Sequence, residues 1–229
     1  MQRISIVVPA LNEAAGIAAT LEGLQSFRAG GHEVIVVDGG SADGTQERAR
    51  AAADRIISAQ RGRAAQMNAG AALARGEILL FLHADTRLPG NADALVLDGL
   101  AASGRAWGRF DVRIEGESPL LPVIALCMNL RSRITGIATG DQAIFARRDA
   151  FVRAGGFPAI ELMEDIALSR ALKRISPPLC LSAKVVTSGR RWESRGVLRT
   201  VLLMGWLRLR FFFGVAPARL ARLYDRERG

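Results

Sequence analysis

The sequence is poor in the side chains that build disulfide frameworks and metal clusters. Its 229 residues include two cysteines and two histidines. Cys127 and Cys180 are far apart and stand among apolar residues, so we expect two buried, unpaired thiols in a reducing compartment. Because His32 and His83 are the only histidines, a multi-histidine zinc site is excluded.

Three common catalytic signatures are also missing. The chain has no G-x-x-x-x-G-K-[ST] loop, no G-x-G-x-x-G after its first predicted strand and no G-x-S-x-G elbow. P-loop, dinucleotide-binding and serine-hydrolase functions therefore lose their main support. No run of about 18 uncharged apolar residues occurs, so we expect no membrane span. The N-terminus leads directly into a predicted strand without a signal peptide, which favours a cytoplasmic protein.

The composition is that of a globular protein, with 49% hydrophobic and 23% charged residues. A chain of this length can bury a core and form one domain, at most two. The net charge of +9 is uneven, because the 46 residues from Lys184 onward hold 11 basic and 3 acidic side chains. The rest is nearly neutral, which argues against nucleic-acid binding and for a basic C-terminal element with its own partner.

Strands and helices alternate in the first hundred residues. Apolar runs predict strands at 4–8, 34–37, 55–57 and 78–82, and periodicity predicts helices at about 13–27, 41–53 and 64–74. This order predicts an α/β fold with a mainly parallel central sheet and helices on both faces.

The second half is less regular. Residues 107–114 alternate like an exposed or antiparallel strand, and 143–146 form a short strand. Helices are predicted at 119–134, 149–154 and 164–174. Residues 196–224 interleave apolar side chains with arginines, which predicts amphipathic C-terminal helices.

Polar side chains follow the predicted strands where α/β sheets bind ligands. Asp38 follows the second strand, where it can accept hydrogen bonds from a base or ribose or cap the Gly39–Gly40 turn. His83 and Asp85 follow the fourth strand, where a divalent ion can link Asp85 to a diphosphate.

Two helix starts carry further candidates. Arg61 and Arg63 flank a glycine before the helix at 64–74, which suits an anion or a solvated basic turn. Glu164 and Asp165 open the helix at 164–174, where they can complement the helix dipole. Asp165 can alternatively act as a general base that takes a proton from a hydroxyl.

Five segments, taken in order, resemble glycosyltransferase family 2, whose members have the GT-A fold. They are IVVPALNE, VVDGGSADGT, GRAAQMNAGAALARGEILLFLHADT, TGDQAIFARRDAFVRAGGFP and MEDIALSRAL. Each alone is weakly specific, but five in sequence over nearly the whole chain are specific. The HADT and TGDQ wording resembles a subgroup found beside radical-SAM and selenium-related proteins.

The resemblance implies a set of site residues. Asp165 would be the catalytic base, and Asp85 with His83 would bind Mn²⁺ or Mg²⁺. The donor would contact Pro9, Asn12, Glu13, Asp38, Arg63 and Ala84. The acceptor and diphosphate would contact Gly140, Asp141, Gln142, Glu164, Arg191 and Trp192.

The chain also departs from the family pattern. His83 replaces the usual first Asp of the D-x-D motif, which puts the metal affinity in question. The Gln-x-x of processive synthases is missing before Arg191–Trp192. We therefore expect an inverting, metal-assisted, non-processive transfer from a nucleotide-diphosphate sugar, UDP-sugar favoured. The alternative is a non-catalytic GT-A module that binds a nucleotide sugar or a lipid head group.

The expected organisation is a GT-A-like catalytic domain at 1–192 and a basic amphipathic helical element at 193–229. The nucleotide-binding half spans about 1–105 and the acceptor half about 106–192. The C-terminal element can lie on an anionic membrane, at its inner face, or pack against the core or a second subunit. The acceptor, a small molecule or a lipid-linked one, and the oligomeric state stay open.

Overall fold

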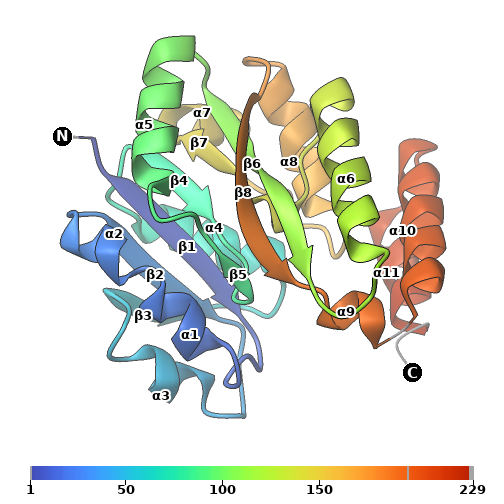
Figure 1. The fold of residues 1–229 in the computed structure, drawn as a ribbon, viewed down its shortest axis with the longest axis horizontal. Helices are drawn as coiled ribbons and strands as arrows, with labels where there is room; N and C mark the ends of the chain where they lie inside the picture. The colour runs from blue at the N-terminus through green and yellow to red at the C-terminus, as the bar shows by residue number, and fades with distance from the viewer. Residues whose placement is uncertain (1, 195, 227–229) are drawn as a thin grey trace.

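The computed structural model describes residues 2–194 and 196–226, and Figure 1 shows their fold. A central eight-stranded sheet has the order β3-β2-β1-β4-β7-β6-β8-β5. Helices lie on both of its faces, and the C-terminal helices stand at one side. The predicted α/β, GT-A-like architecture with C-terminal helices is confirmed.

The first half of the chain supplies the parallel part of the sheet. Strand β1 pairs in parallel with β2 and β4, and β2 pairs in parallel with β3. All residues of β1, β2 and β4 are buried, as their apolar runs predict. The bounds are β1 Ile4–Ala10, β2 Glu33–Asp38, β3 Arg55–Ser58 and β4 Ile78–Phe81.

The second half continues the sheet with mixed directions. Strand β7 is antiparallel to both β4 and β6, and β8 is parallel to β6 but antiparallel to β5. The antiparallel prediction for 107–114 is therefore correct at the β7 side, whereas the exposed alternative is wrong because β6 is largely buried. The bounds are β5 Thr86–Arg87, β6 Trp107–Glu115, β7 Phe145–Arg147 and β8 Leu179–Ser188.

The helices divide between the two faces of the sheet. One apolar cluster joins α1, α2, α5 and α6 to the sheet, and a second joins α4, α7 and α8 to its other face. The bounds are α1 Ile17–Glu22, α2 Gln25–Ala29, α3 Thr45–Ala49, α4 Arg63–Leu73, α5 Ala92–Ser103, α6 Leu121–Thr135, η1 Gly140–Gln142, α7 Arg148–Arg153, α8 Glu164–Lys173, α9 Arg190–Glu193, α10 Val197–Phe212 and α11 Pro217–Arg226.

Helix α4 lies unusually close to the sheet because of Gly70. A Cβ atom at this position would stand 2.4 Å from Val7 Cγ1 and 2.9 Å from Val37 Cγ2. Only a residue without a side chain allows this approach. The close packing holds α4, which begins at Arg63, against β1 and β2.

The C-terminal helices pack on the start of α8. A third apolar cluster joins Met163 and Ile166 to Leu207 of α10 and Leu220 of α11. Both leucines are fully buried. The basic C-terminal element is thus attached to the segment that carries Glu164 and Asp165.

Several elements differ from the sequence prediction. The helix predicted at 13–27 is two short helices, since the chain turns at Gly23–Leu24 with a hydrogen bond from Leu24 N to Leu21 O of 3.0 Å. The sequence did not predict α5 or β8. Cys127 is exposed and Cys180 partly exposed, so the predicted burial of both thiols is wrong. Cys127 lies on α6, one face of which is open to solvent.

Candidate functional site

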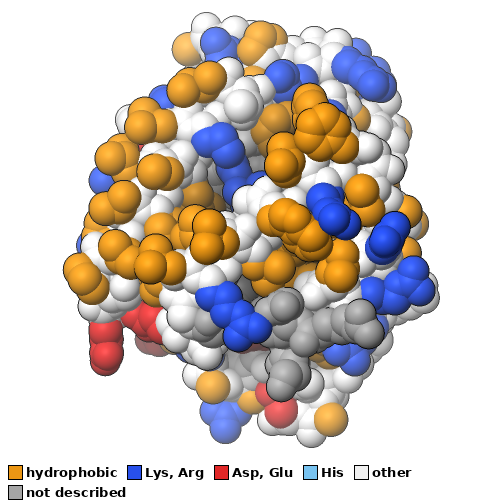
Figure 2. Space-filling view, turned by 90° about the vertical axis from the view of Figure 1, so that its right-hand side faces the viewer, with side chains coloured by type: hydrophobic (Ala, Val, Ile, Leu, Met, Phe, Trp, Pro, Cys, Tyr) orange, Lys and Arg blue, Asp and Glu red, His pale blue; other side chains and the backbone are white. Residues whose placement is uncertain are grey.

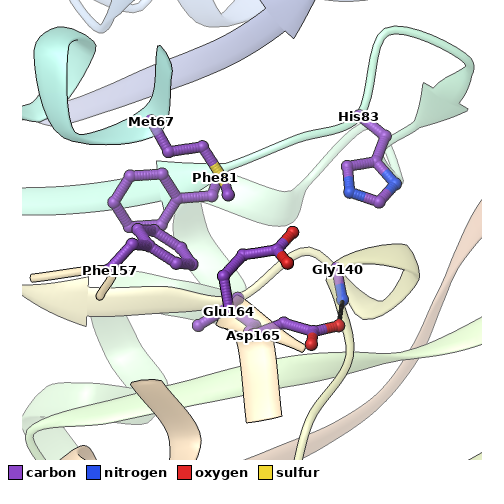
Figure 3. A pocket seen from close by; sticks show the side chains of 8 residues that line it. Met67, Phe81, His83, Gly140, Phe157, Glu164 and Asp165 are labelled. Carbon is purple, nitrogen blue, oxygen red and sulfur yellow. Dashed lines mark hydrogen bonds between the residues drawn. The ribbon is translucent and has the colours of Figure 1, made fainter. Parts of the chain in front are cut away.

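Three segments meet at the carboxyl edge of the parallel strands and form a small hollow (Figure 3). They are the turn after β4, the η1 segment and the start of α8. The hollow has a volume of about 10 Å³, which is room for about one water molecule or hydroxyl group. Its lining consists of Met67, Phe81, His83, Gly140, Ile144, Phe157, Glu164 and Asp165.

The carboxylate of Asp165 is held by two backbone N–H groups. Gly140 N donates to Oδ2 at 2.9 Å, and Ile166 N donates to Oδ1 at 2.7 Å. Figure 3 shows the first of these bonds at the bottom of the hollow. Each carboxylate oxygen keeps a further lone pair. The geometry therefore positions Asp165 at the first turn of α8 while leaving it able to accept a proton.

Glu164 is the buried carboxyl group of the hollow, and Figure 3 shows its side chain between Met67 and His83. Burial raises the pKa of Glu164 above its ordinary value, and the negative charge of Asp165 raises it further. Arg63 and His83 oppose this shift. These two residues thus lie within electrostatic reach of Glu164, which brings four predicted site residues together.

His83 and Asp141 form a pair at the rim. His83 Nδ1 lies 3.2 Å from Asp141 Oδ1. The η1 segment approaches the imidazole so closely that a Cβ atom at Gly140 would stand 2.4 Å from Nε2. Gly140 is therefore required for the contact between η1 and the turn after β4.

Asp85 lies in the same turn and is partly exposed. Its carboxylate accepts a long hydrogen bond of 3.5 Å from the Thr86 hydroxyl. Within the described parts of the chain, no group of three or more His, Cys, Asp or Glu side chains could hold a metal ion. The partly exposed carboxylate of Asp85 nevertheless suits Mg²⁺ or Mn²⁺, because such ions are commonly bound by one or two carboxylates together with substrate phosphates.

Asp38 lies at the same edge of the sheet, at the end of β2. Its carboxylate accepts hydrogen bonds from Gly40 N at 3.0 Å, Ser41 N at 2.9 Å, Gln46 Nε2 at 2.8 Å and the Ser41 hydroxyl. Burial by itself would raise the pKa of Asp38, but the hydrogen bonds from Ser41, Gln46 and Gly40 outweigh it and lower the pKa. Asp38 therefore caps the turn at Gly39–Gly40, as one of the two alternatives predicted. Donor binding by Asp38 stays a prediction.

The loop after β1 is tied to the loop after β2. Asn12 N donates to Ser41 Oγ at 2.9 Å, and Asn12 Oδ1 accepts from Ala42 N at 3.0 Å. Asn12 has a φ of +53°, a conformation that Asn tolerates better than most residues. Glu13 Oε2 lies 3.4 Å from Arg190 Nη2 of α9. Both loops therefore present a fixed backbone beside Asp38.

The remaining predicted residues have varied environments. Pro9 is buried in β1, and the buried Ala84 accepts a 2.6 Å hydrogen bond from the Thr20 hydroxyl at its carbonyl. Gln142 is buried and donates to Asn129 Oδ1 at 3.3 Å. Trp192 packs partly buried on the core, whereas the side chain of Arg191 lies outside what the structure describes. For all of them ligand binding stays a prediction.

Two further residues near the site were not predicted from the sequence. Arg131 of α6 and Arg208 of α10 both lie within electrostatic reach of Asp141 and Asp165. In sequence, an arginine on an amphipathic helix indicates a solvated face. No pattern in the chain distinguishes these two arginines from the exposed ones around them.

The comparison with known protein families decides the affiliation. The profile described as "Glycosyl transferase family 2" matches residues 5–152. The chain belongs to glycosyl transferase family 2. The matched region contains the turn after β4 and the η1 segment, and it ends before the Glu164–Asp165 pair of α8.

Family 2 relatives are found by sequence and by structure. The "PGL/p-HBAD biosynthesis glycosyltransferase" of Mycobacterium bovis is 40% identical over 91 residues, which are 37% of this chain and 36% of that protein. Residues 1–349 of Staphylococcus aureus TarS in complex with UDP-GlcNAc match with a TM-score of 0.66 at 20% identity, covering 81% of this chain and 58% of that one.

A second solved structure gives a similar result. The mannosyltransferase PcManGT of Pyrobaculum calidifontis, in complex with GDP-Man and Mn²⁺, matches with a TM-score of 0.64 at 23% identity. The match covers 81% of this chain and 56% of that one. Identities this low show the fold alone. By sequence, the chain spans about a third of the length of the mycobacterial relative described above.

Proposed function

We propose that this protein transfers a sugar from a nucleotide-diphosphate sugar to an acceptor hydroxyl with inversion at the anomeric carbon. The observation that carries the proposal is the hollow in which Asp165, Glu164 and His83 face one another beside the sheet edge. Family membership supports sugar transfer. The neighbour bound to UDP-GlcNAc supports a UDP-sugar donor.

In the proposed reaction, Asp165 is the general base. The acceptor oxygen attacks the anomeric carbon from the face opposite the diphosphate, and the acceptor proton moves to Asp165. The bond between the anomeric carbon and the diphosphate oxygen breaks, and its electron pair leaves with the nucleoside diphosphate. The two N–H groups that hold Asp165 keep its carboxylate in place for this proton transfer.

A divalent ion, Mn²⁺ or Mg²⁺, is part of the proposal. Asp85 would hold it, with His83 as the second candidate ligand, and the diphosphate oxygens of the donor would complete its shell. When bound, the ion neutralises charge on the departing diphosphate. The PcManGT complex, which contains Mn²⁺ and GDP-Man, supports this choice.

The test is a donor screen followed by a turnover assay. UDP, GDP and their sugar derivatives are added with Mn²⁺, and thermal stabilisation reports binding while released nucleoside diphosphate reports turnover. We expect UDP-sugars to stabilise the protein and to be hydrolysed slowly or transferred. Absence of both effects with every donor would contradict the proposal.

A non-catalytic module that binds a nucleotide sugar or a lipid head group is the second candidate. It is favoured by His83, which stands in the metal motif and is paired with Asp141 instead of being free for a cation. Donor binding without nucleotide release or transfer, with Mn²⁺ present, would support this candidate over catalysis.

We also propose that the protein docks on the inner face of an anionic membrane through α6, α10 and α11. Among the described residues, no helix is long and apolar enough to span a membrane. Figure 2 shows hydrophobic side chains gathered on this face with Lys and Arg between them. Exposed side chains include Ile134, Leu202, Leu209, Phe212 and Phe213. Apolar side chains among arginines suit the head-group region of acidic lipids.

A further inference from the structure

Two partly buried arginines that the proposed mechanism does not use contain buried guanidinium nitrogens without hydrogen bonds. Arg131 Nε and Nη2 and Arg208 Nε are inaccessible to solvent and have no hydrogen-bond partner among the residues that the structure describes. A guanidinium carries five N–H donors, and a buried charge without partners is costly. The fold therefore leaves three buried guanidinium nitrogens of these two cations without an acceptor.

The pair faces the candidate catalytic carboxylates. Burial lowers the pKa of Arg131 to about 10, and the neighbouring charge of Arg208 adds to this effect, while Asp165 and Asp141 oppose it. Burial likewise lowers the pKa of Arg208 against the influence of the same two carboxylates. The positive charge of Arg109 also lowers the pKa of Arg131. The two arginines thus share one environment with Asp165 although they come from different helices.

Other arginines of this region have partners within the protein. Arg109 is paired with Asp111 and also donates to Asn129 O at 3.2 Å. Arg133, two residues from Arg131, lies 2.7 Å from Asp111 Oδ2. Arg210 stacks over Trp206 with its Cζ 4.2 Å from the ring centroid. Arg109 Nε also lacks an acceptor, but the charge of Arg109 is paired with Asp111. Within the described residues, Arg131 and Arg208 have no such ion pair and no ring contact.

We propose that Arg131 and Arg208 bind an acidic group of the acceptor, a phosphate or a carboxylate, beside Asp165. The role as an acceptor site rests on the proposed sugar transfer, whereas the anion site itself rests on the unpaired arginines. Guanidinium groups match the planar oxygens of carboxylates and phosphates in bidentate geometry. An anion between the two would satisfy their free donors and relieve their mutual repulsion.

The position favours the acceptor over the donor. Arg131 and Arg208 stand on α6 and α10 in the second half of the chain, whereas the loops predicted to hold the nucleotide follow β1 and β2. If the acidic group of an acceptor binds between these arginines, the hydroxyl groups of that acceptor would lie next to Asp165, the proposed base. The acidic group would also lie beneath the apolar face that α6 and α10 present to solvent.

The first test measures binding of inorganic phosphate by calorimetry, with and without saturating UDP. We expect phosphate to bind in both conditions, and Arg131→Gln and Arg208→Gln each to weaken it about ten- to a hundredfold. Arg133→Gln and Arg210→Gln, on the same two helices, should leave it unchanged. No phosphate binding, or equal binding to all variants, would overturn the proposal.

The same experiment separates the acceptor from the donor diphosphate. If UDP displaces phosphate and both Gln variants weaken UDP to the same degree, the arginines hold the donor and the proposal is wrong. If UDP fails to bind the wild type, the proposed transfer fails while the phosphate measurement still reports on the anion site. These two failures are therefore distinguishable.

Thermal unfolding distinguishes binding from a structural role. Because Arg131 keeps two buried nitrogens without an acceptor, Arg131→Gln should leave the melting temperature unchanged or raise it, and Arg131→Lys should keep part of the phosphate binding. A melting temperature lowered together with phosphate affinity in both variants would mean that the arginine supports the fold, which contradicts the proposal.

Competition identifies the source of the acidic group. Bound phosphate is challenged with glycerol 3-phosphate and, separately, with phosphatidylcholine vesicles that contain phosphatidic acid. Displacement by the first indicates a soluble acceptor, and displacement only by the second indicates a lipid head group; both support the proposal. Failure of both to displace phosphate would overturn the acceptor role.

Discussion

At the scale of single residues, Asp165 is the side chain on which the proposed chemistry depends. We expect Asp165→Asn to lower turnover by roughly 10²–10⁴-fold, the usual contribution of a general base. Asparagine keeps one acceptor oxygen, and with it one of the two backbone hydrogen bonds. Because Asp165 is not among the residues predicted to contact the donor, UDP binding should change little. The measurement is nucleotide release together with UDP titration. Asp149→Asn, an exposed carboxylate on α7, is the matched control, and near-normal turnover in Asp165→Asn would remove the assignment.

Glu164 should make stability depend on pH. Its pKa is raised by burial and by Asp165, so the folded protein holds this proton more tightly than the unfolded chain does. The penalty is absent below the unfolded value near 4.5 and grows as the pH rises through the folded pKa. Glu164→Gln should therefore stabilise the protein at pH 8 and have little effect at pH 4.

Thermal unfolding at the two pH values tests this expectation, with the exposed Glu161→Gln as the control for losing one charge before α8. An equal change at both pH values in Glu164→Gln would contradict the raised pKa.

At the scale of elements, glycine decides how closely helices pack. Gly70→Ala would place a methyl group 2.4 Å from Val7 Cγ1 and should destabilise the protein by about 1–3 kcal/mol through overpacking. Gly205 of α10 has nothing within 4 Å of an added Cβ. Gly205→Ala should instead stabilise by about 0.5–1 kcal/mol, since alanine is the better helix former. Denaturant unfolding of both variants checks the two signs.

At the scale of the whole molecule, the exposed apolar face should control attachment to vesicles. Leu202→Glu on α10 and Ile134→Glu on α6 should each reduce sedimentation with phosphatidylserine-containing vesicles at least about tenfold. Each change replaces an apolar side chain that would enter the bilayer by a negative charge that acidic lipids repel. Val152→Glu, at a similarly exposed position on α7, should have no effect. Sedimentation that is insensitive to acidic lipid would contradict the membrane proposal.

The sequence predicts the parts of the fold that rest on local pattern. The apolar runs of β1, β2 and β4 identify the parallel sheet. His83 and Asp85 are identified as candidates by their position just after β4. Strand β8 was missed because only two of its ten residues, Val185 and Thr187, are buried, so no apolar run identifies it. The boundaries of the two halves and of the C-terminal element stay predictions, as does the subgroup of family 2.

The site could be predicted only in part for a similar reason. Asp165 and Glu164 are recognisable because they open a helix together. Arg131 and Arg208 become conspicuous only once α10 lies beside α6 (Figure 1), because tertiary packing, and not spacing in sequence, removes them from water. Charge that is hidden by long-range packing leaves no local pattern.

The seating of Leu207 and Leu220 against Met163 and Ile166 has a mechanical consequence. The outer side of α10 faces solvent, while its inner side packs against the turn that carries Asp165, the proposed general base. If a bilayer or a protein binds the outer side of α10 and shifts the helix, the turn at Met163–Ile166 should shift with it. The proposed membrane attachment and the proposed alignment of Asp165 would in this way be coupled through the packing of Leu207 and Leu220.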